Sequence, residues 1–336
     1  MPGTPSPRAW WAQRPPAAGA AVMATGILSV GLHLTGYEVL SRILLAVAAV
    51  TWLALAADFV ARLLRDRPRW MAEAGTPAAL TAVAATTVLG TRLSALDRQL
   101  LAEALLAPAA LLWPLLIASV VSHWRRSMPG GVFLSCVATQ GLALLGATLA
   151  EAERSAWLAH AALVLFWLGL VLYALALTRF DFRQVWEGAG DHWVAGGALA
   201  ISALAGSRLI VADSPALYLW NTDDRGVLRA VTAALLVLAV CWYVVLLAAE
   251  VARPRLRHDM RRWATVFPMG MTAAALLSAA TALDASWIEG PGEALLWIAV
   301  AAWLGLAAGA AGAALTAWNT VGRPRRPDRP RDGGAP

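Results

Sequence analysis

Ten long apolar stretches divide this chain, and its arginine residues gather in every second gap between them. A helix of about 20 residues crosses a hydrocarbon core about 30 Å thick, so each stretch is a candidate transmembrane helix. The runs are continuous rather than alternating, which excludes a transmembrane β-barrel. The predicted spans are 17–34, 39–63, 77–93, 100–122, 131–150, 156–177, 193–211, 226–251, 264–283 and 291–318.

The distribution of arginine predicts how these spans are oriented. Most of the 27 basic residues lie in the N-terminal tail, in the gaps after the second, fourth, sixth and eighth spans, and in the C-terminal tail. Short basic loops stay on the cytoplasmic side of a membrane. We therefore expect a multi-pass protein of the cell membrane with both termini in the cytoplasm. Short links on the other side make each odd span and the even span after it an antiparallel hairpin.

Composition supports this interpretation. Hydrophobic residues make up 59% of the chain and charged residues 14%, whereas a soluble domain is about half apolar and about a quarter charged. We expect an all-α membrane protein of ten helices in five hairpins, with residues 1–16 as a cytoplasmic tail, 17–318 as one transmembrane domain and 319–336 as a disordered basic tail. The net charge of +6 follows from the topology and indicates contact with anionic lipid headgroups rather than with nucleic acid.

The chain offers no set of residues for catalysis or metal binding. Cys136 and Cys241 both lie inside apolar spans, so neither a disulfide nor a metal site is expected from them. The five histidines are scattered, and no paired nucleophile and base occurs at depth. We therefore predict a protein that is not an enzyme and has no cofactor.

Odd and even spans differ in character. The even spans carry bulky aliphatic and aromatic residues that suit lipid, whereas the odd spans are rich in small and hydroxylated residues. Such residues either allow close helix packing or line a narrow polar path. Taken as a set, they predict an inner ring of odd helices around a central pore. The candidate pore-lining residues are Thr25, Gly26, Ser29, Thr86, Thr87, Thr139, Gln140, Ser202 and Thr272.

A short repeat marks the outer ends of the odd spans. Glycine, two residues and then leucine recur at positions 31–34, 90–93, 146–149 and 206–209. The third position of three copies is basic, as His33, Arg92 and Arg208. We interpret these residues as a basic collar that draws anions into the outer mouth, the alternative being side chains that reach the headgroups.

The ninth span contains the adjacent pair Phe267 and Pro268, with Gly270 close behind. A proline inside a helix removes one hydrogen bond and bends the backbone. An aromatic side chain at such a break is a candidate gate, although kinks beside aromatic residues are also common in ordinary helices.

Two segments resemble a known family. They are Val22-Met23-Ala24-Thr25-Gly26-Ile27-Leu28-Ser29 and Trp263-x3-Phe267-Pro268-x-Gly270. Both are similar to the tellurite-resistance/C4-dicarboxylate transporter family, which includes slow-type anion channels, malate permeases and sulfite exporters. The resemblance implies five hairpins around a pore, conduction of small anions, a phenylalanine gate that matches Phe267, and a homotrimer. Pro268 is the one proline inside an odd span of this sequence, so bends in the other odd spans would have to form at glycine residues.

The sequence therefore predicts a channel or permease for small anions, such as a C4-dicarboxylate, sulfite, a tellurite-type oxyanion, chloride or nitrate. A proton-coupled dicarboxylate carrier or an oxyanion efflux pump is the alternative, in which Arg92 and Arg208 bind the substrate directly. A non-transporting membrane subunit is a more remote alternative.

Overall fold

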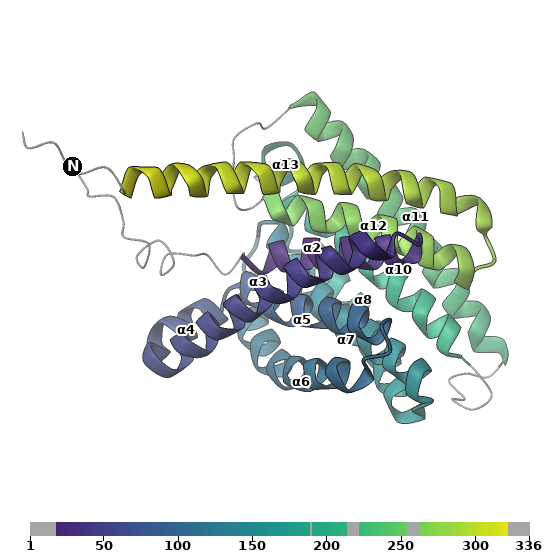
Figure 1. Ribbon diagram of the computed structural model, residues 1–336. Coiled ribbons are helices and arrows are strands. Elements are labelled where there is room, and N and C mark those ends of the chain that lie inside the picture. The colour runs from purple at the N-terminus through teal and green to yellow at the C-terminus, as the bar shows by residue number, and fades with distance from the viewer. Residues whose placement is uncertain (1–17, 189, 214–221, 254–261, 322–336) are drawn as a thin grey trace, which may run out of the picture.

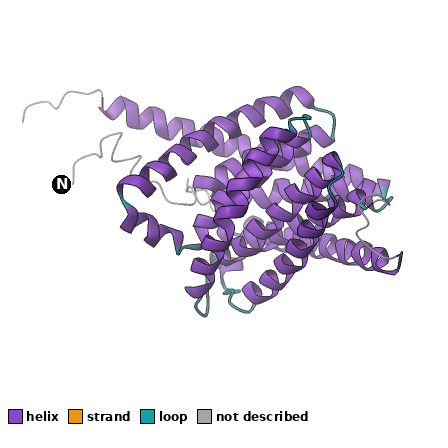
Figure 2. Ribbon diagram, turned by 90° about the horizontal axis from the view of Figure 1, so that it is seen from below, coloured by secondary structure: helices purple, strands orange, loops and turns teal. Residues whose placement is uncertain are grey.

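The computed structural model describes residues 18–188, 190–213, 222–253 and 262–321. These residues form helices joined by short loops, with no strand among them (Figure 2). The long helices are α2 (Gly19–Leu34), α3 (Glu38–Arg65), α5 (Thr81–Ser94), α6 (Gln99–Ser122), α7 (Leu134–Glu153), α8 (Ala156–Leu177), α10 (Val194–Ala212), α11 (Thr222–Ala252), α12 (Trp263–Ala282) and α13 (Glu289–Val321). The short ones are α4 (Arg67–Ala74), η2 (Pro77–Leu80), η3 (Gly130–Phe133), α9 (Gln184–Glu187), η4 (Asp191–Trp193) and η6 (Ser286–Ile288).

Each predicted span coincides with one of the long helices. Within the described residues, eight helical segments are long and apolar enough to cross a membrane. The other two spans are shorter than expected, because α2 has 16 residues and α5 has 14. The first four residues of the third span, Pro77–Leu80, form the tighter 3₁₀ turn η2, so α5 begins only at Thr81. α13 continues to Val321, three residues past the predicted end of the tenth span. The predicted tail at 1–16 and most of the predicted tail at 319–336 lie outside the described residues.

Five helices form the interior of the protein. We call α2, α5, α7, α10 and α12 the core helices, and α3, α6, α8, α11 and α13 the peripheral helices. In the most apolar 18 residues of each segment, 78–100% of residues are buried for α7, α10 and α12 but only 11–33% for the peripheral helices. Most residues of α2 and α5 are buried as well. The exposed side chains of the peripheral helices are mainly aliphatic and aromatic, as expected for contact with lipid.

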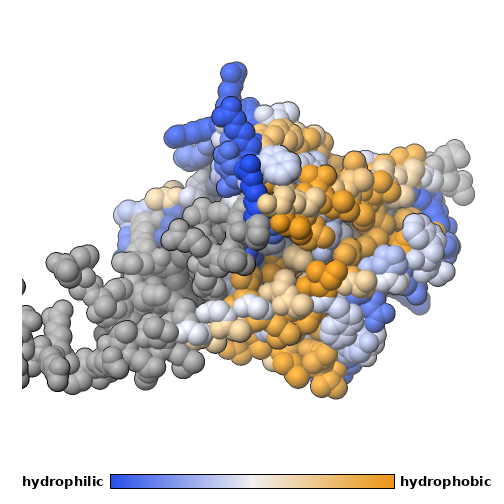
Figure 3. All heavy atoms as spheres, turned by 90° about the horizontal axis from the view of Figure 1, so that it is seen from above, coloured by the Kyte–Doolittle hydropathy of each residue, from blue (hydrophilic) through white to orange (hydrophobic). Residues whose placement is uncertain are grey.

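The core helices contact one another in a closed succession. α2 packs against α5, α5 against α7, α7 against α10, α10 against α12, and α12 against α2 again. Figure 1 shows α13 along one edge of the bundle and α6 near the opposite edge, with α2, α12 and α10 between them. Figure 3 shows apolar residues over the middle of one face and hydrophilic residues gathered toward its edges.

Glycine allows the core helices to approach closely. A Cβ atom added at Gly197 of α10 would lie 2.8 Å from Cγ of Pro268 in α12. One added at Gly26 of α2 would lie 2.9 Å from Val88 of α5. Both distances are shorter than a normal carbon–carbon contact, so only glycine fits these crossings without a shift of the helices.

Candidate functional site

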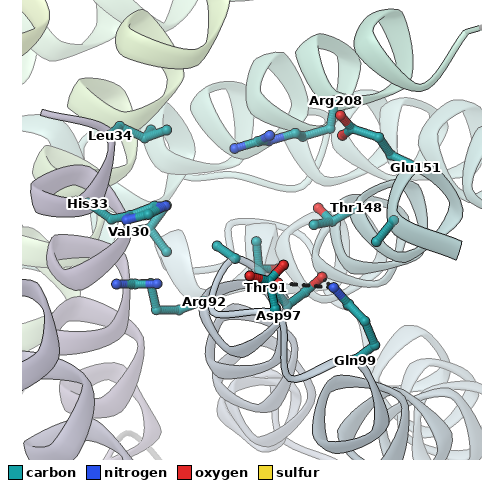
Figure 4. A pocket seen from close by; sticks show the side chains of 13 residues that line it. Val30, His33, Leu34, Thr91, Arg92, Asp97, Gln99, Thr148, Glu151 and Arg208 are labelled. Carbon is teal, nitrogen blue, oxygen red and sulfur yellow. Dashed lines mark hydrogen bonds between the residues drawn. The ribbon is translucent and has the colours of Figure 1, made fainter. Parts of the chain in front are cut away.

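A polar cavity lies where α2, α5, α7 and α10 end. It has a volume of about 290 Å³, and its lining includes all three basic residues of the predicted collar: His33, Arg92 and Arg208. Figure 4 shows His33 and Arg92 on one side of this cavity, and Arg208 with Glu151 on the other. We call it the end cavity. The structure thus brings together three residues that are far apart in the sequence.

Arg92 is held in an ion pair that the sequence analysis missed. Its side chain is 0% exposed, and Nη2 donates a 2.8 Å hydrogen bond to Oε1 of Glu38 at the start of α3. The same carboxylate is 2.8 Å from Nδ1 of His33 and 2.9 Å from Nε of Arg42. Glu38 therefore compensates much of the charge of Arg92. The spacing of four residues between Glu38 and Arg42 was the available sequence signal.

Ser41 fixes the other side of the Arg92 guanidinium. Arg92 Nε donates to Oγ of Ser41 at 2.9 Å, and Ser41 and Ser29 donate to each other's backbone carbonyl oxygens at 2.7 Å. The third nitrogen, Nη1, is buried and has no hydrogen-bond partner in the structure. A buried donor left without an acceptor is costly, so part of the free energy gained from the other two contacts is offset.

Arg208 differs from Arg92. In the part of the chain that the structure describes, its guanidinium makes no hydrogen bond and no ion pair within 4.0 Å. It also lines a second cavity of about 540 Å³, which we call the side cavity, together with Ser278, Glu289 and Glu293. Arg208 and Leu34 therefore line both cavities, which lie at the same end of the bundle.

Carboxylates surround these two cavities, and the sequence analysis did not weigh them. Asp97 and Glu151 line the end cavity, while Glu289 and Glu293 line the side cavity. The predicted collar of His33, Arg92 and Arg208 is thus interspersed with acidic side chains from the neighbouring helix ends and loops. Its role in drawing anions into the mouth stays a prediction.

Three of the predicted pore-lining threonines are bound to peripheral helices. Each hydroxyl donates to the carbonyl oxygen four residues before it and accepts a hydrogen bond from a tryptophan indole N–H. The pairs are Trp303 with Thr25 at 2.9 Å, Trp52 with Thr86 at 2.8 Å, and Trp113 with Thr139 at 2.8 Å. These hydrogen bonds turn the three hydroxyls toward the peripheral helices and stabilise contacts between helices.

The remaining candidates also make contacts between helices or within one helix. Gln140 Nε2 donates to the carbonyl oxygen of Phe166 in α8 at 3.0 Å, and its Oε1 is buried without a partner. The hydroxyls of Thr87, Ser202 and Thr272 donate to carbonyl oxygens of their own helices.

Comparison with known proteins identifies the family. A family model described as "Voltage-dependent anion channel" (SLAC1) matches residues 13–311. The chain belongs to this anion channel family. It is a multi-pass membrane protein of a family of channels and transporters, which confirms the resemblance found in the sequence.

Two curated relatives, both called uncharacterized membrane proteins, come from two strains of Mycobacterium tuberculosis. Each is 32% identical over 119 residues, which cover 33% of this chain and 58% of the relative. The chain thus matches little more than half of the length of these relatives.

Phe267 and Pro268, the residues of the predicted gate, lie in the interior of α12. Phe267 is 1% exposed, and Pro268 packs against Gly197 of α10. Because proline has no N–H, the carbonyl of Ala264 lacks its usual helical partner. The aromatic ring and the break in the hydrogen-bond ladder therefore occur at the same level of the core.

Among the described residues, no three His, Cys, Asp or Glu side chains are grouped to hold a metal ion. Cys136 is buried, Cys241 is exposed on α11, and both are free thiols.

Proposed function

We propose that this protein is a channel or permease for small anions in the cell membrane, with its path along the axis enclosed by the five core helices. The observation that supports this most is the closed succession of buried helices, α2–α5–α7–α10–α12, with two arginines in a cavity at one end. Membership of the voltage-dependent anion channel family agrees with it. In this proposal the chain forms five hairpins. The core helix of each hairpin belongs to an inner ring, and its peripheral partner separates the path from lipid.

The end cavity is the external mouth in this proposal. The basic loops lie at the opposite ends of the helices, and the positive-inside rule places them in the cytoplasm together with both termini. Anions then enter beside Arg208 and Arg92 and leave between the N-terminal ends of the core helices. The hydroxyls of Thr25, Thr86 and Thr139 are not part of the wall, so the path is lined mainly by small apolar side chains.

Phe267 is the proposed gate. Its ring is buried at the level where Pro268 interrupts α12, so a modest change at this break would move the ring. A buried aromatic ring in the path blocks an ion by excluding water, as hydrophobic constrictions do in other channels.

The test is anion flux in proteoliposomes with Phe267→Ala. Opening the constriction should raise chloride or nitrate flux by about tenfold, which corresponds to a barrier lowered by about 1.4 kcal/mol. Phe166→Ala is the matched control, because Phe166 is equally buried but lies on the peripheral helix α8. Unchanged flux in a folded Phe267→Ala protein, or an equal rise in both variants, argues against the gate.

The same vesicles distinguish a channel from a coupled carrier. A channel carries anions down their own gradient at a rate independent of an imposed pH gradient, whereas a proton-coupled dicarboxylate carrier accumulates substrate only when that gradient is present. We also propose a homotrimer, which the mass of the detergent-solubilised protein measured by light scattering tests directly.

A further inference from the structure

We infer that Gly197 positions the gate, because a residue without a side chain lets α10 lie directly against Pro268 and hold Phe267 toward the path. This inference deepens the proposed function and rests on its gate, since it names the residue that determines whether the ring occludes. Gly197 acts through α12 and does not touch the anion, so it is a positioning residue.

The first observation is the contact between α10 and α12. A Cβ atom added at Gly197 would lie 2.8 Å from Cγ, 3.0 Å from Cβ and 3.2 Å from Cα of Pro268. These are its three nearest heavy atoms, and all belong to the residue directly after Phe267. At Gly31, by contrast, the nearest atom is the end of the flexible Leu296 side chain. A proline ring is rigid, so a side chain at position 197 has to displace the backbone of α12 or of α10.

The second observation is the direction in which Phe267 points. α12 lies between α10 and α2 in the succession of core helices. Pro268 contacts α10, whereas Gly270 lies against α2, where an added Cβ atom would be 3.0 Å from Ile27. Successive residues of an α-helix are rotated by about 100°, so Pro268 and Gly270 are about 200° apart and Phe267 lies in the shorter arc between them. In a closed ring of helices this arc faces the enclosed axis, so the Phe267 ring points toward the proposed path.

The third observation is the way in which α12 is held on both sides of Pro268. Just before α12, Nη1 of Arg262 lies 3.4 Å from Oε1 of Glu250 in α11. At Pro268 the helix lacks one N–H, and the Thr272 hydroxyl donates a 2.9 Å hydrogen bond to the Pro268 carbonyl oxygen, so bending is easiest there. Beyond it, the close packing of Gly270 on α2 leaves no room for α12 to move away from α10. Pressure on Pro268 therefore changes the bend of α12 and turns the ring of the preceding residue.

Nitrate flux through Gly197→Ala in proteoliposomes tests the inference. The added methyl group should turn Phe267 away from the path and raise the flux by about tenfold, as expected for Phe267→Ala, because both changes lower the same barrier. Gly196→Ala is the matched control: its Cβ atom would lie 3.2 Å from Cβ of Trp242 in α11, so it presses on a different neighbour and should leave the flux unchanged. Equal fluxes through Gly197→Ala and the wild-type protein, or an equal rise in both alanine variants, would overturn the inference.

Double substitutions separate an effect on the gate from a general effect on the path. In a Phe267→Ala background there is no ring to turn, so adding Gly197→Ala should change the flux by less than about twofold. A further rise of the full size there would refute a role through the gate. If Gly197→Ala does not fold, Pro268→Ala removes the closest atom, and adding Gly197→Ala to it should still raise the flux, because Cβ and Cα of residue 268 remain within 3.2 Å of the new methyl group. Equal fluxes through Pro268→Ala with and without Gly197→Ala would also overturn the inference.

The failure of the gate and the failure of this inference have different signatures. If Phe267→Ala does not raise the flux, the proposed gate fails. If Phe267→Ala raises the flux and a folded Gly197→Ala protein does not, the gate stands and the inference alone is refuted. A 4-fluorophenylalanine at position 267 reports the ring directly: its fluorine resonance should shift in Gly197→Ala and stay in place in Gly196→Ala, and an unshifted resonance in both contradicts the role of Gly197.

Discussion

Arg92 on α5 donates a 2.8 Å hydrogen bond to Glu38 on α3, although no part of the Arg92 side chain is exposed. The pair joins a core helix to the peripheral helix of another hairpin. An isolated guanidinium in this position would be costly, and a partner carboxylate makes its burial possible. The role of Arg92 is therefore chiefly to hold the end of α5 in place.

Glu38→Gln should destabilise the protein by about 2 kcal/mol, because it leaves a buried guanidinium without its counter-charge. SDS-induced unfolding in mixed micelles measures this difference. Arg42→Gln is the control, since Arg42 pairs with the same carboxylate but is 65% exposed and should contribute less than about 0.5 kcal/mol. Equal effects of the two substitutions would show that Arg92 does not depend on Glu38.

The bond between Trp113 and Thr139 should contribute a measurable coupling energy. A double-mutant cycle with Trp113→Phe and Thr139→Val removes the indole N–H and the hydroxyl in turn while keeping most of the packing. Hydrogen bonds between membrane helices average about 0.6 kcal/mol and reach about 1.7 kcal/mol, and we expect a value in that range. Trp287→Phe, at a side chain that is 78% exposed, should have no effect. A coupling energy of zero would mean that Thr139 is free to face the path.

Gly197→Ala should destabilise the contact between α10 and α12. The new Cβ atom would lie 2.8 Å from Pro268, so one helix must move, at a cost of about 1–3 kcal/mol. Gly305→Ala in α13 is the matched control, because nothing lies within 4 Å of a Cβ atom added there. That substitution should be neutral or stabilise the helix by up to about 1 kcal/mol. The same unfolding assay compares both, and a Gly197→Ala protein as stable as the wild type would contradict the tight crossing.

The orientation can be tested by labelling in intact cells. Asp97→Cys places a thiol in an exposed loop beside the end cavity, and a membrane-impermeant maleimide should label it from outside. Ser127→Cys lies in an exposed loop at the opposite ends of the helices and should react only after the cells are opened. The background carries Cys241→Ala, since Cys241 is the exposed native thiol. The reverse labelling pattern would invert the proposed topology.

The positions of the helices could be predicted from the sequence. The neighbour that each side chain of a helix contacts could not. A continuous apolar run of this length can cross a membrane only as a helix. The predicted span 156–177 accordingly coincides with α8. A core helix, however, is buried all round, and its composition does not reveal which side meets a neighbour. Thr25 therefore looked like a residue of the pore wall, while its partner Trp303 lies 278 residues further along the chain. Glu38 was missed because it lies at the end of a span, where the apolar pattern carries no information.

The contact between the first and last hairpins has a consequence for biosynthesis. α2 is synthesised well before its neighbours α12 and α13. Until they arrive, one flank of α2, including the Thr25 hydroxyl, has no partner from its own chain. The early hairpins therefore remain incompletely packed, in the bilayer or beside the insertion machinery, until α12 is inserted. A chain truncated before α12 cannot complete the succession of core helices.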